Sequence, residues 1–553
     1  MKIKYDLKKI ILVLLTLAAG VKLAAWGWTI DEGYAFAMGN RLVQGDRLFT
    51  DMWELHQTSA YAVFFFLKIF RMLTSSCEGE VLFVRAAGAV IQFIVSFILY
   101  LNLKKHMPSD KAFLLAIIYA NLSPKQMSTP EHSNILNWTS TLVLICIDAL
   151  WSLKKEDKKL KTYGLPILSG ALLSLCVLSY PQAIIFAVFV FVLIFIKGEG
   201  RVKNLVTVLC TCAVLALAFV LSIVKGLPVP ALFNTVKNMI AVDSTHVGGL
   251  AKLLGYMKDC GILILFVAGF GLVSYVTSKF FKNEKLLVPL AVLYVFTWKF
   301  LHIMLRFDHY SVEFTFGGVL IVIVIALISA FRRGKISDEN TRLLLLFGGG
   351  GAAVFLTVLV ACNQSVFSSA KYLSCAVVAA LAVGIDLTGK KEKIITFIAV
   401  IMIVLVNIVQ LGNPSNKLLN ITDADARVPA GPQKWLIMER MYANKARIDF
   451  EELPAIMDNA DFVMITGDAV TYLYTDARIG NGSTIMTEDY GERFGIYWDV
   501  YPEKKPDIIA IECYEGLVDY RVARSWLYEY ATGEFGADEV IDTTYYRLYI
   551  RNN

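Results

Sequence analysis

Long apolar runs recur along the first 411 residues of this chain, and they decide its fold class. A helix that crosses a bilayer needs about 20 mostly apolar residues, or fewer where the flanking side chains reach the interface. By that criterion about thirteen runs qualify as spans, at 10–27, 81–103, 111–127, 134–152, 163–179, 182–196, 204–224, 261–279, 286–305, 313–331, 342–361, 371–388 and 394–411. The composition agrees, since 56% of the 553 residues are hydrophobic and only 18% are charged. We therefore expect an α-helical polytopic membrane protein.

Charge divides the chain near residue 422. Residues 423–553 hold 24 acidic and 13 basic residues, a net charge of −11, whereas the preceding residues have a net charge of +17. A basic apolar body followed by an acidic polar segment predicts a membrane domain over 1–411 and a soluble domain over 412–553. The positive excess is a topology signal and does not indicate a nucleic-acid partner.

The acidic segment mixes two kinds of pattern. Strand-like runs occur at 461–466, 507–513 and 545–551, and helical periodicity occurs around 433–443 and 520–530. Alternation of these types predicts a small α/β domain.

Basic residues set the topology, and residues 59–74 are the ambiguous segment. If 59–74 lies on the outer surface as an interfacial helix, one set of loops contains 25 basic residues. The other set of loops contains roughly a dozen basic residues. The positive-inside rule therefore places the N-terminus in the cytoplasm and the acidic domain on the extracytoplasmic side of the membrane. The large outer loops are then 28–80, 225–260 and 121–133, and chemistry is expected to face outward.

The strongest chemical feature is the acidic pair Asp31-Glu32, directly after the first span. Two adjacent carboxylates at a membrane face can supply a general base and its hydrogen-bond or metal partner, because burial and like charge separate their pKa values. The competing interpretation is a solvated helix N-terminus, where the helix dipole favours acids. The apolar spacing over 33–44 predicts an amphipathic helix after the pair.

Two further outer segments carry polar side chains that could face an acceptor, or that could belong to ordinary loops. Residues 46–58 are expected to lie along the membrane, and Pro124 and Pro130 break the helices around the second segment. The candidates in these segments are Asp51, Glu54, His56, Lys125, Glu131 and His132.

A basic stripe marks the ninth span and its outer end. Lys299, His302 and Arg306 share one helical face, and His309-Tyr310 follows. Such a stripe can hold a phosphate or diphosphate near the outer headgroups. The alternative is that these side chains snorkel to the interface.

Five of the six histidines fall on the outer side in this topology, at positions 56, 132, 246, 302 and 309. They would suit a metal site with the acidic pair. No tight ligand spacing supports one, so we assign no metal ligands, and a divalent cation stays a possible cofactor only.

The order of these features resembles the GT-C class of polyprenyl-phosphate-sugar-dependent glycosyltransferases. The shared order is a first span, an acidic pair, an amphipathic juxtamembrane helix, the element Gly45-Asp46, a second juxtamembrane helix and then many spans. More narrowly, the chain is similar to the bacterial branch with the lipid A aminoarabinose transferase, protein mannosyltransferases and Rgt-type lipopolysaccharide glycosyltransferases. The resemblance implies a GT-C fold of about 13 transmembrane helices with outer juxtamembrane helices and a soluble C-terminal domain.

The resemblance also implies roles for particular residues. Asp31 matches the aspartate that deprotonates the acceptor hydroxyl, with Glu32 as its partner, and His309-Tyr310 matches a late motif that approaches the donor phosphate. Many members have a Lys-Pro-Pro or Pro-Pro-Leu sequence where this chain has residues 54–59. We therefore expect Lys299 or Arg306 to bind the phosphate instead.

The implied reaction is inverting transfer of a sugar from a polyprenyl-phosphate donor to a lipid, an envelope glycan or a protein. Membrane lipids surround the protein and are expected to contact it. A transporter or flippase for lipid-linked or envelope precursors is the alternative, although paired halves are not evident in the sequence. A catalytically silent relative is a third interpretation, in which the acids only cap helices.

Cysteine labelling tests the topology. On intact cells, cysteines introduced within 46–58 should react with an impermeant reagent, because these residues lie outside. Cysteines within 154–161 should stay unlabelled until the membrane is opened. The opposite pattern would mean that 59–74 spans the bilayer and inverts every later segment.

Overall fold

A computed structural model of the chain describes most of its residues. They are 6–54, 56–124, 127–154, 159–225, 227–241, 250–281, 290, 293–294, 297, 337–361, 366–387, 400–401, 403–405, 407–411, 419–484, 493–514, 516–518 and 522–552. The span expected at 313–331 lies outside the described residues, as does nearly all of the span expected at 286–305.

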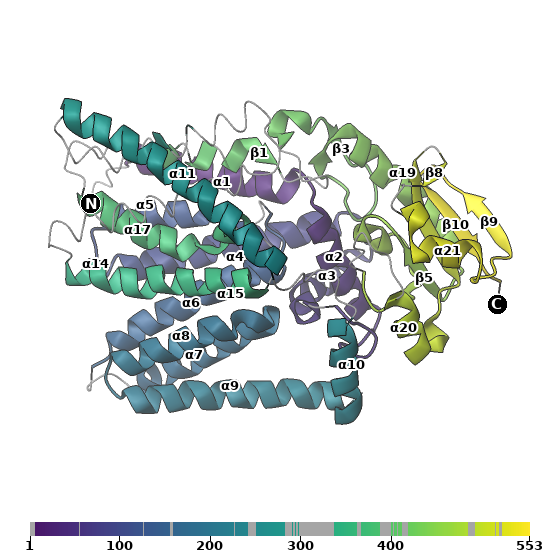
Figure 1. Cartoon of the computed structure of the whole chain (residues 1–553), viewed down its shortest axis with the longest axis horizontal. Helices are drawn as coiled ribbons and strands as arrows, with labels where there is room; N and C mark the ends of the chain where they lie inside the picture. The colour runs from purple at the N-terminus through teal and green to yellow at the C-terminus, as the bar shows by residue number, and fades with distance from the viewer. Residues whose placement is uncertain are drawn as a thin grey trace.

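A group of helices forms a body at one end of the molecule (Figure 1). They are α1 (Leu7–Ala25), α4 (Glu80–Leu103), α5 (Ser109–Ala120), α6 (His132–Trp151), α7 (Lys159–Ser179), α8 (Ile184–Ile196), α9 (Arg201–Val224), α11 (Leu250–Phe281), α14 (Asp338–Leu343), α15 (Gly349–Ala361) and α17 (Ser374–Leu387). Within the described part of the chain, five helices are long and apolar enough to cross a membrane. The helices coincide with the apolar runs, which confirms a polytopic helical fold.

Three further helices lie in the segments expected as outer loops. They are α2 (Ile30–Val43), α3 (Ala60–Thr74) and α10 (Val229–Ala241). The predicted helices at 33–44 and 59–74 are thus confirmed as helices, and the interfacial position of α3 stays a prediction. Gly39 of α2 faces Val63 of α3 so closely that a side chain there would collide with it. This small residue lets the two helices approach each other.

The C-terminal residues form the α/β domain that the alternating patterns predict. The main sheet has the order β6 (Arg478–Ile479), β5 (Phe462–Ile465), β7 (Ile508–Tyr514), β10 (Tyr546–Ile550) and β9 (Glu539–Asp542). The pairs β5–β6 and β5–β7 are parallel, whereas β10 is antiparallel to both of its neighbours. The domain also contains α19 (Arg440–Met457), α20 (Arg493–Val500), α21 (Trp526–Thr532) and the short strand β8 (Leu517–Val518), which pairs with β7.

Residues 28–80, which we call the first loop, share hydrophobic cores with this domain. Trp28, Phe36 and Val63 pack in one cluster with buried residues of 428–474. Trp53 packs in another with Trp498. Backbone hydrogen bonds join the same regions, from Gly27 N to Ile437 O (2.8 Å) and from Trp53 N to Gly482 O (2.7 Å). In Figure 1, α2 and α3 accordingly lie between the helical body and the sheet.

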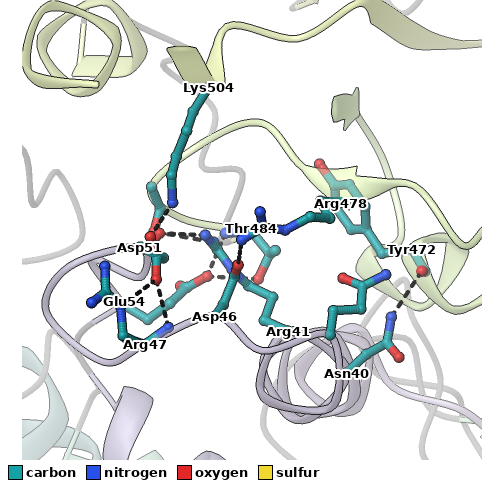
Figure 2. A network of polar contacts seen from close by, with 12 residues as sticks. Asn40, Arg41, Asp46, Arg47, Asp51, Glu54, Tyr472, Arg478, Thr484 and Lys504 are labelled. Carbon is teal, nitrogen blue, oxygen red and sulfur yellow. Dashed lines mark hydrogen bonds and ion pairs between the residues drawn. The ribbon is translucent and has the colours of Figure 1, made fainter. Parts of the chain in front are cut away.

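A buried arginine joins the loop to the domain, and we call this contact the Arg41 joint. The Arg41 side chain is fully buried, and its Nε lies 2.8 Å from Asp46 Oδ2. Its two terminal nitrogens donate to the carbonyl oxygens of Gly482 and Asp51 (Figure 2). Asp46 also pairs with Arg478, at 2.6 Å. The joint therefore satisfies one buried charge with groups from both parts of the chain.

Asp51 and Glu54, expected to face an acceptor, lie in the same joint. Lys504 donates to one oxygen of Asp51, and the backbone nitrogen of Arg47 donates to the other (2.7 Å). Burial alone would raise the pKa of Asp51, but these hydrogen bonds outweigh burial and lower it. Glu54 Oε1 accepts from the backbone and the hydroxyl of Thr484, at 2.5 and 2.8 Å. These contacts give both acids a structural role.

Asp468 fixes the other end of α2. Its carboxylate accepts hydrogen bonds from Trp28 Nε1 (2.5 Å) and from Val470 N (3.1 Å). The carboxylate also fills the space beside Gly33 of α2, so a side chain at position 33 would clash with it. Burial raises the pKa of Asp468 to about 7, although these hydrogen bonds oppose the shift.

Replacing Arg41 should destabilise the whole contact. Arg41→Met leaves the buried Asp46 with Arg478 alone, so we expect the free energy of unfolding to fall by about 3–5 kcal/mol. Denaturant unfolding of the protein in nanodiscs, followed by tryptophan fluorescence, measures it. Arg47→Met is the matched control, because the Arg47 side chain is 59% exposed and its loss should cost no more than about 1 kcal/mol. Equal effects of the two variants would contradict the joint.

Asp468 should make stability depend on pH. The folded protein keeps this carboxyl protonated up to a pH of about 7, whereas the unfolded chain ionises it near about 4. Stability is therefore lost as pH rises through this window, by on the order of 4 kcal/mol in all. The free energy of unfolding of Asp468→Asn, relative to that of wild type, should therefore increase as pH rises from about 4 to about 7 and stay constant at higher pH. Parallel pH profiles of the two proteins would contradict the assignment.

Candidate active site

The acidic pair lies in the first turn of α2, and its two carboxylates have different surroundings. Glu32 is fully buried, whereas Asp31 is exposed. Successive residues of a helix point about 100° apart, since one turn takes 3.6 residues. Only Asp31 of the two is therefore open to a ligand.

Glu32 is anchored by partners from two other segments. Arg85 of α4 places its Nε 3.2 Å from Glu32 Oε1, and the Thr129 hydroxyl donates to the same oxygen at 2.5 Å. Arg85 also donates to the carbonyl oxygens of Gly27 (3.1 Å) and Trp26 (3.3 Å). Burial raises the pKa of Glu32, although Arg85 and Thr129 oppose the shift. Glu32 thus ties α2 to α4 and to the segment before α6.

The second predicted acid is at the start of α6. Glu131 caps this helix by accepting a hydrogen bond from Asn134 N (3.0 Å). Its other oxygen lies 2.8 Å from His132 Nδ1. The His132 ring stacks on His56, with centroids 4.1 Å apart, and His56 stacks on Tyr180 at 4.9 Å. We call Glu131, His132, His56 and Tyr180 the histidine stack.

The structure therefore brings the segments 31–32 and 129–132 together. Thr129 contacts Glu32 and lies two residues before Glu131, and the charge of Glu131 is one of the groups that raise the pKa of Glu32. The exposed Asp31, the anchored Glu32 and the histidine stack form one candidate site. Their roles in chemistry stay predictions.

Six predicted site residues lie outside the part of the chain that the structure describes: Lys125, Lys299, His302, Arg306, His309 and Tyr310. The described residues contain no group of three histidine, cysteine or acidic side chains placed to hold a metal ion.

Three residues of the site are absent from the sequence-based candidates: Arg85, Thr129 and Tyr180. Arg85 carries a signal that could have found it, because a charge within the apolar run 81–103 marks a functional position or an ion-pair partner. Thr129 and Tyr180 have no comparable signal, since a hydroxyl and an aromatic ring are ordinary in such segments.

Comparison with known proteins gives structural neighbours only. No family model and no curated sequence matches the chain. The oligosaccharyltransferase AglB from Archaeoglobus fulgidus, in complex with an inhibitory peptide and a dolichol-phosphate, is similar with a TM-score of 0.46 and 12% identity, over 93% of this chain and 70% of that one. ArnT from Cupriavidus metallidurans bound to undecaprenyl phosphate is similar with a TM-score of 0.45 and 10% identity, over 98% and 97%. Both are GT-C glycosyltransferases. At values this low, similarity alone assigns neither a family nor an activity.

Proposed function

We propose that this chain is a membrane glycosyltransferase of the GT-C type, which takes its sugar from a polyprenyl-phosphate donor at the outer face of the cytoplasmic membrane. The observation that carries the proposal is the exposed Asp31 beside the buried Glu32. An accessible carboxylate can take a proton from an incoming hydroxyl group. Its neighbour, bound by Arg85 and Thr129, holds the first turn of α2 in place.

The reaction is a single displacement at the anomeric carbon. Asp31 accepts the proton of the acceptor hydroxyl while the hydroxyl oxygen forms the new bond to that carbon. The bond from the carbon to the phosphate oxygen breaks, and its electron pair leaves with the polyprenyl phosphate. The configuration at the anomeric carbon is therefore inverted.

Cations near the departing phosphate would stabilise its charge. In the described site Arg85 is already bound to Glu32, so it does not serve this purpose. The proposed phosphate ligands are Lys299 or Arg306, together with His302, His309 and Tyr310. The histidine stack, beside the acid pair, is proposed to contact the acceptor.

Asp31→Asn tests the reaction and the base together. Membranes that contain wild type or variant are given a panel of labelled polyprenyl-phosphate hexoses and pentoses with envelope extract as acceptor. Loss of the general base should lower transfer about 100-fold or more. Asp425→Asn is the control, because Asp425 is an exposed acid of the C-terminal domain outside the candidate site, and it should retain transfer.

Two results would contradict the proposal. Equal transfer by Asp31→Asn and wild type, at equal membrane levels, would remove Asp31 as the base. If wild type consumed no donor of the panel, the glycosyltransferase function would fail, and transport of a lipid-linked precursor would be tested next.

A further inference from the structure

The C-terminal domain contains a cavity that the proposed reaction does not use. Its volume is about 280 Å³, and it lies beside α19 at the carboxyl ends of the parallel strands β5 and β7. In α/β sheets this edge is where ligands bind, because the connections leaving the strands open a crevice there. The residues that carry its chemistry are Tyr442, Lys445, Thr466, Glu512, Tyr514 and Tyr545.

The polar groups of the cavity are held in fixed positions. Lys445 donates to Asp449 at 2.5 Å and lies 3.3 Å from Glu512 Oε1. The backbone nitrogen of Glu512 donates to the Thr466 hydroxyl oxygen at 2.7 Å, which leaves the hydroxyl proton for another acceptor. Gly467 has a φ of +88°, and a side chain there would collide with the Glu512 carboxylate. Glycine at this position therefore gives the carboxylate its place on the cavity wall.

Aromatic rings supply the rest of the surface. Tyr514 is 58% exposed, and its ring centroid lies 6.3 Å from that of Tyr545, with the ring planes 34° apart. Tyr442 lines the same cavity. Tyrosine offers an apolar face together with a hydroxyl group, which suits a ligand that is apolar on one face and polar at its rim.

Charge narrows the class of ligand. Lys445 faces two carboxylates, those of Asp449 and Glu512, so the cavity and its immediate wall have a net negative charge. A phosphate or other anion would be repelled. A sugar ring is neutral, places C–H groups against aromatic faces, and presents hydroxyl groups to a carboxylate, an ammonium and a threonine hydroxyl.

We infer that this cavity binds a pyranose ring of a glycan. We identify this glycan as the acceptor of the transfer reaction, and that identification rests on the proposed function. The ring in the cavity belongs to a sugar unit of the acceptor other than the one that receives the new sugar. The fold supports this link, because Thr466 and Gly467 line the cavity while Asp468, the next residue, contacts Trp28 and abuts Gly33 on α2. The segment that forms part of the cavity wall thus contacts the helix that carries Asp31.

Binding is measured directly on the full chain, without the transfer reaction. Saturation-transfer NMR is recorded on the protein in lipid nanodiscs, which avoids detergents with sugar headgroups. The probes are the methyl pyranosides of glucose, mannose, galactose and N-acetylglucosamine, with tetramethylammonium and inorganic phosphate as charged probes. At least one pyranoside should bind to wild type, and phosphate should not.

Two variants locate the site. Glu512→Gln keeps the size of the side chain and should weaken pyranoside binding about tenfold. Tyr514→Ala should weaken it by a similar factor, through lost ring contact. Glu451→Gln is the matched control, because Glu451 is an exposed acid of α19 paired with Arg447 and does not line the cavity. It should bind as wild type does.

The outcomes separate this inference from the proposed function. No pyranoside binding, binding of tetramethylammonium alone, or equal binding by wild type, Glu512→Gln and Tyr514→Ala would each overturn the cavity assignment, even if sugar transfer is observed. Pyranoside binding that both variants weaken, in a protein that transfers no sugar, would support the cavity while the proposed function fails. In an active enzyme, Glu512→Gln should raise the KM for a glycan acceptor about tenfold and leave kcat unchanged.

Discussion

The burial of Arg41 constrains how the first loop and the C-terminal domain fit together. A guanidinium without partners cannot be left in a protein interior, because the cost of removing its charge from water is several kcal/mol. The acceptors that satisfy it come from Asp46, from the Asp51 carbonyl and from the Gly482 carbonyl, which is more than 400 positions away. The first loop and the C-terminal domain must therefore be in place together, and residues of both parts also pack in common hydrophobic clusters.

Helix α2 connects the Arg41 joint to the candidate site. The helix has 14 residues, or about 21 Å at its rise per residue, and carries the acidic pair in its first turn and Arg41 near its last. The Arg41 joint fixes one end, and Arg85, Thr129 and Asp468 fix the other. The C-terminal domain thus helps to set the position of the exposed Asp31 through its contacts with α2. The cavity proposed to bind a sugar is connected to the same helix, because Thr466 and Gly467 line the cavity and Asp468 abuts Gly33.

Features of a single segment could be predicted from the sequence, whereas pairings between segments could not. The apolar runs predicted the helices, since length and hydropathy are local properties, and alternation predicted β5, β7 and β10. The predicted topology placed the 31–32 and 129–132 segments on the same side of the membrane, and the structure brings them together. In contrast, a polar loop gives no indication that Lys504 will bind Asp51 or that Thr484 will bind Glu54. A role of these two acids toward an acceptor stays a prediction. Arg85 was absent from the candidates as well, although its charge within the apolar run 81–103 is a signal that could have found it.

Native-state hydrogen exchange tests most directly whether the first loop and the C-terminal domain form one structural unit. Amides of 36–44 and of 462–480 are followed at increasing denaturant in nanodiscs, so that each segment gives the free energy of its opening reaction. The structure predicts a single opening free energy and a single denaturant dependence for both segments. Opening of 36–44 at a clearly lower free energy, with 462–480 still protected, would show that the loop folds without the domain and would contradict the account.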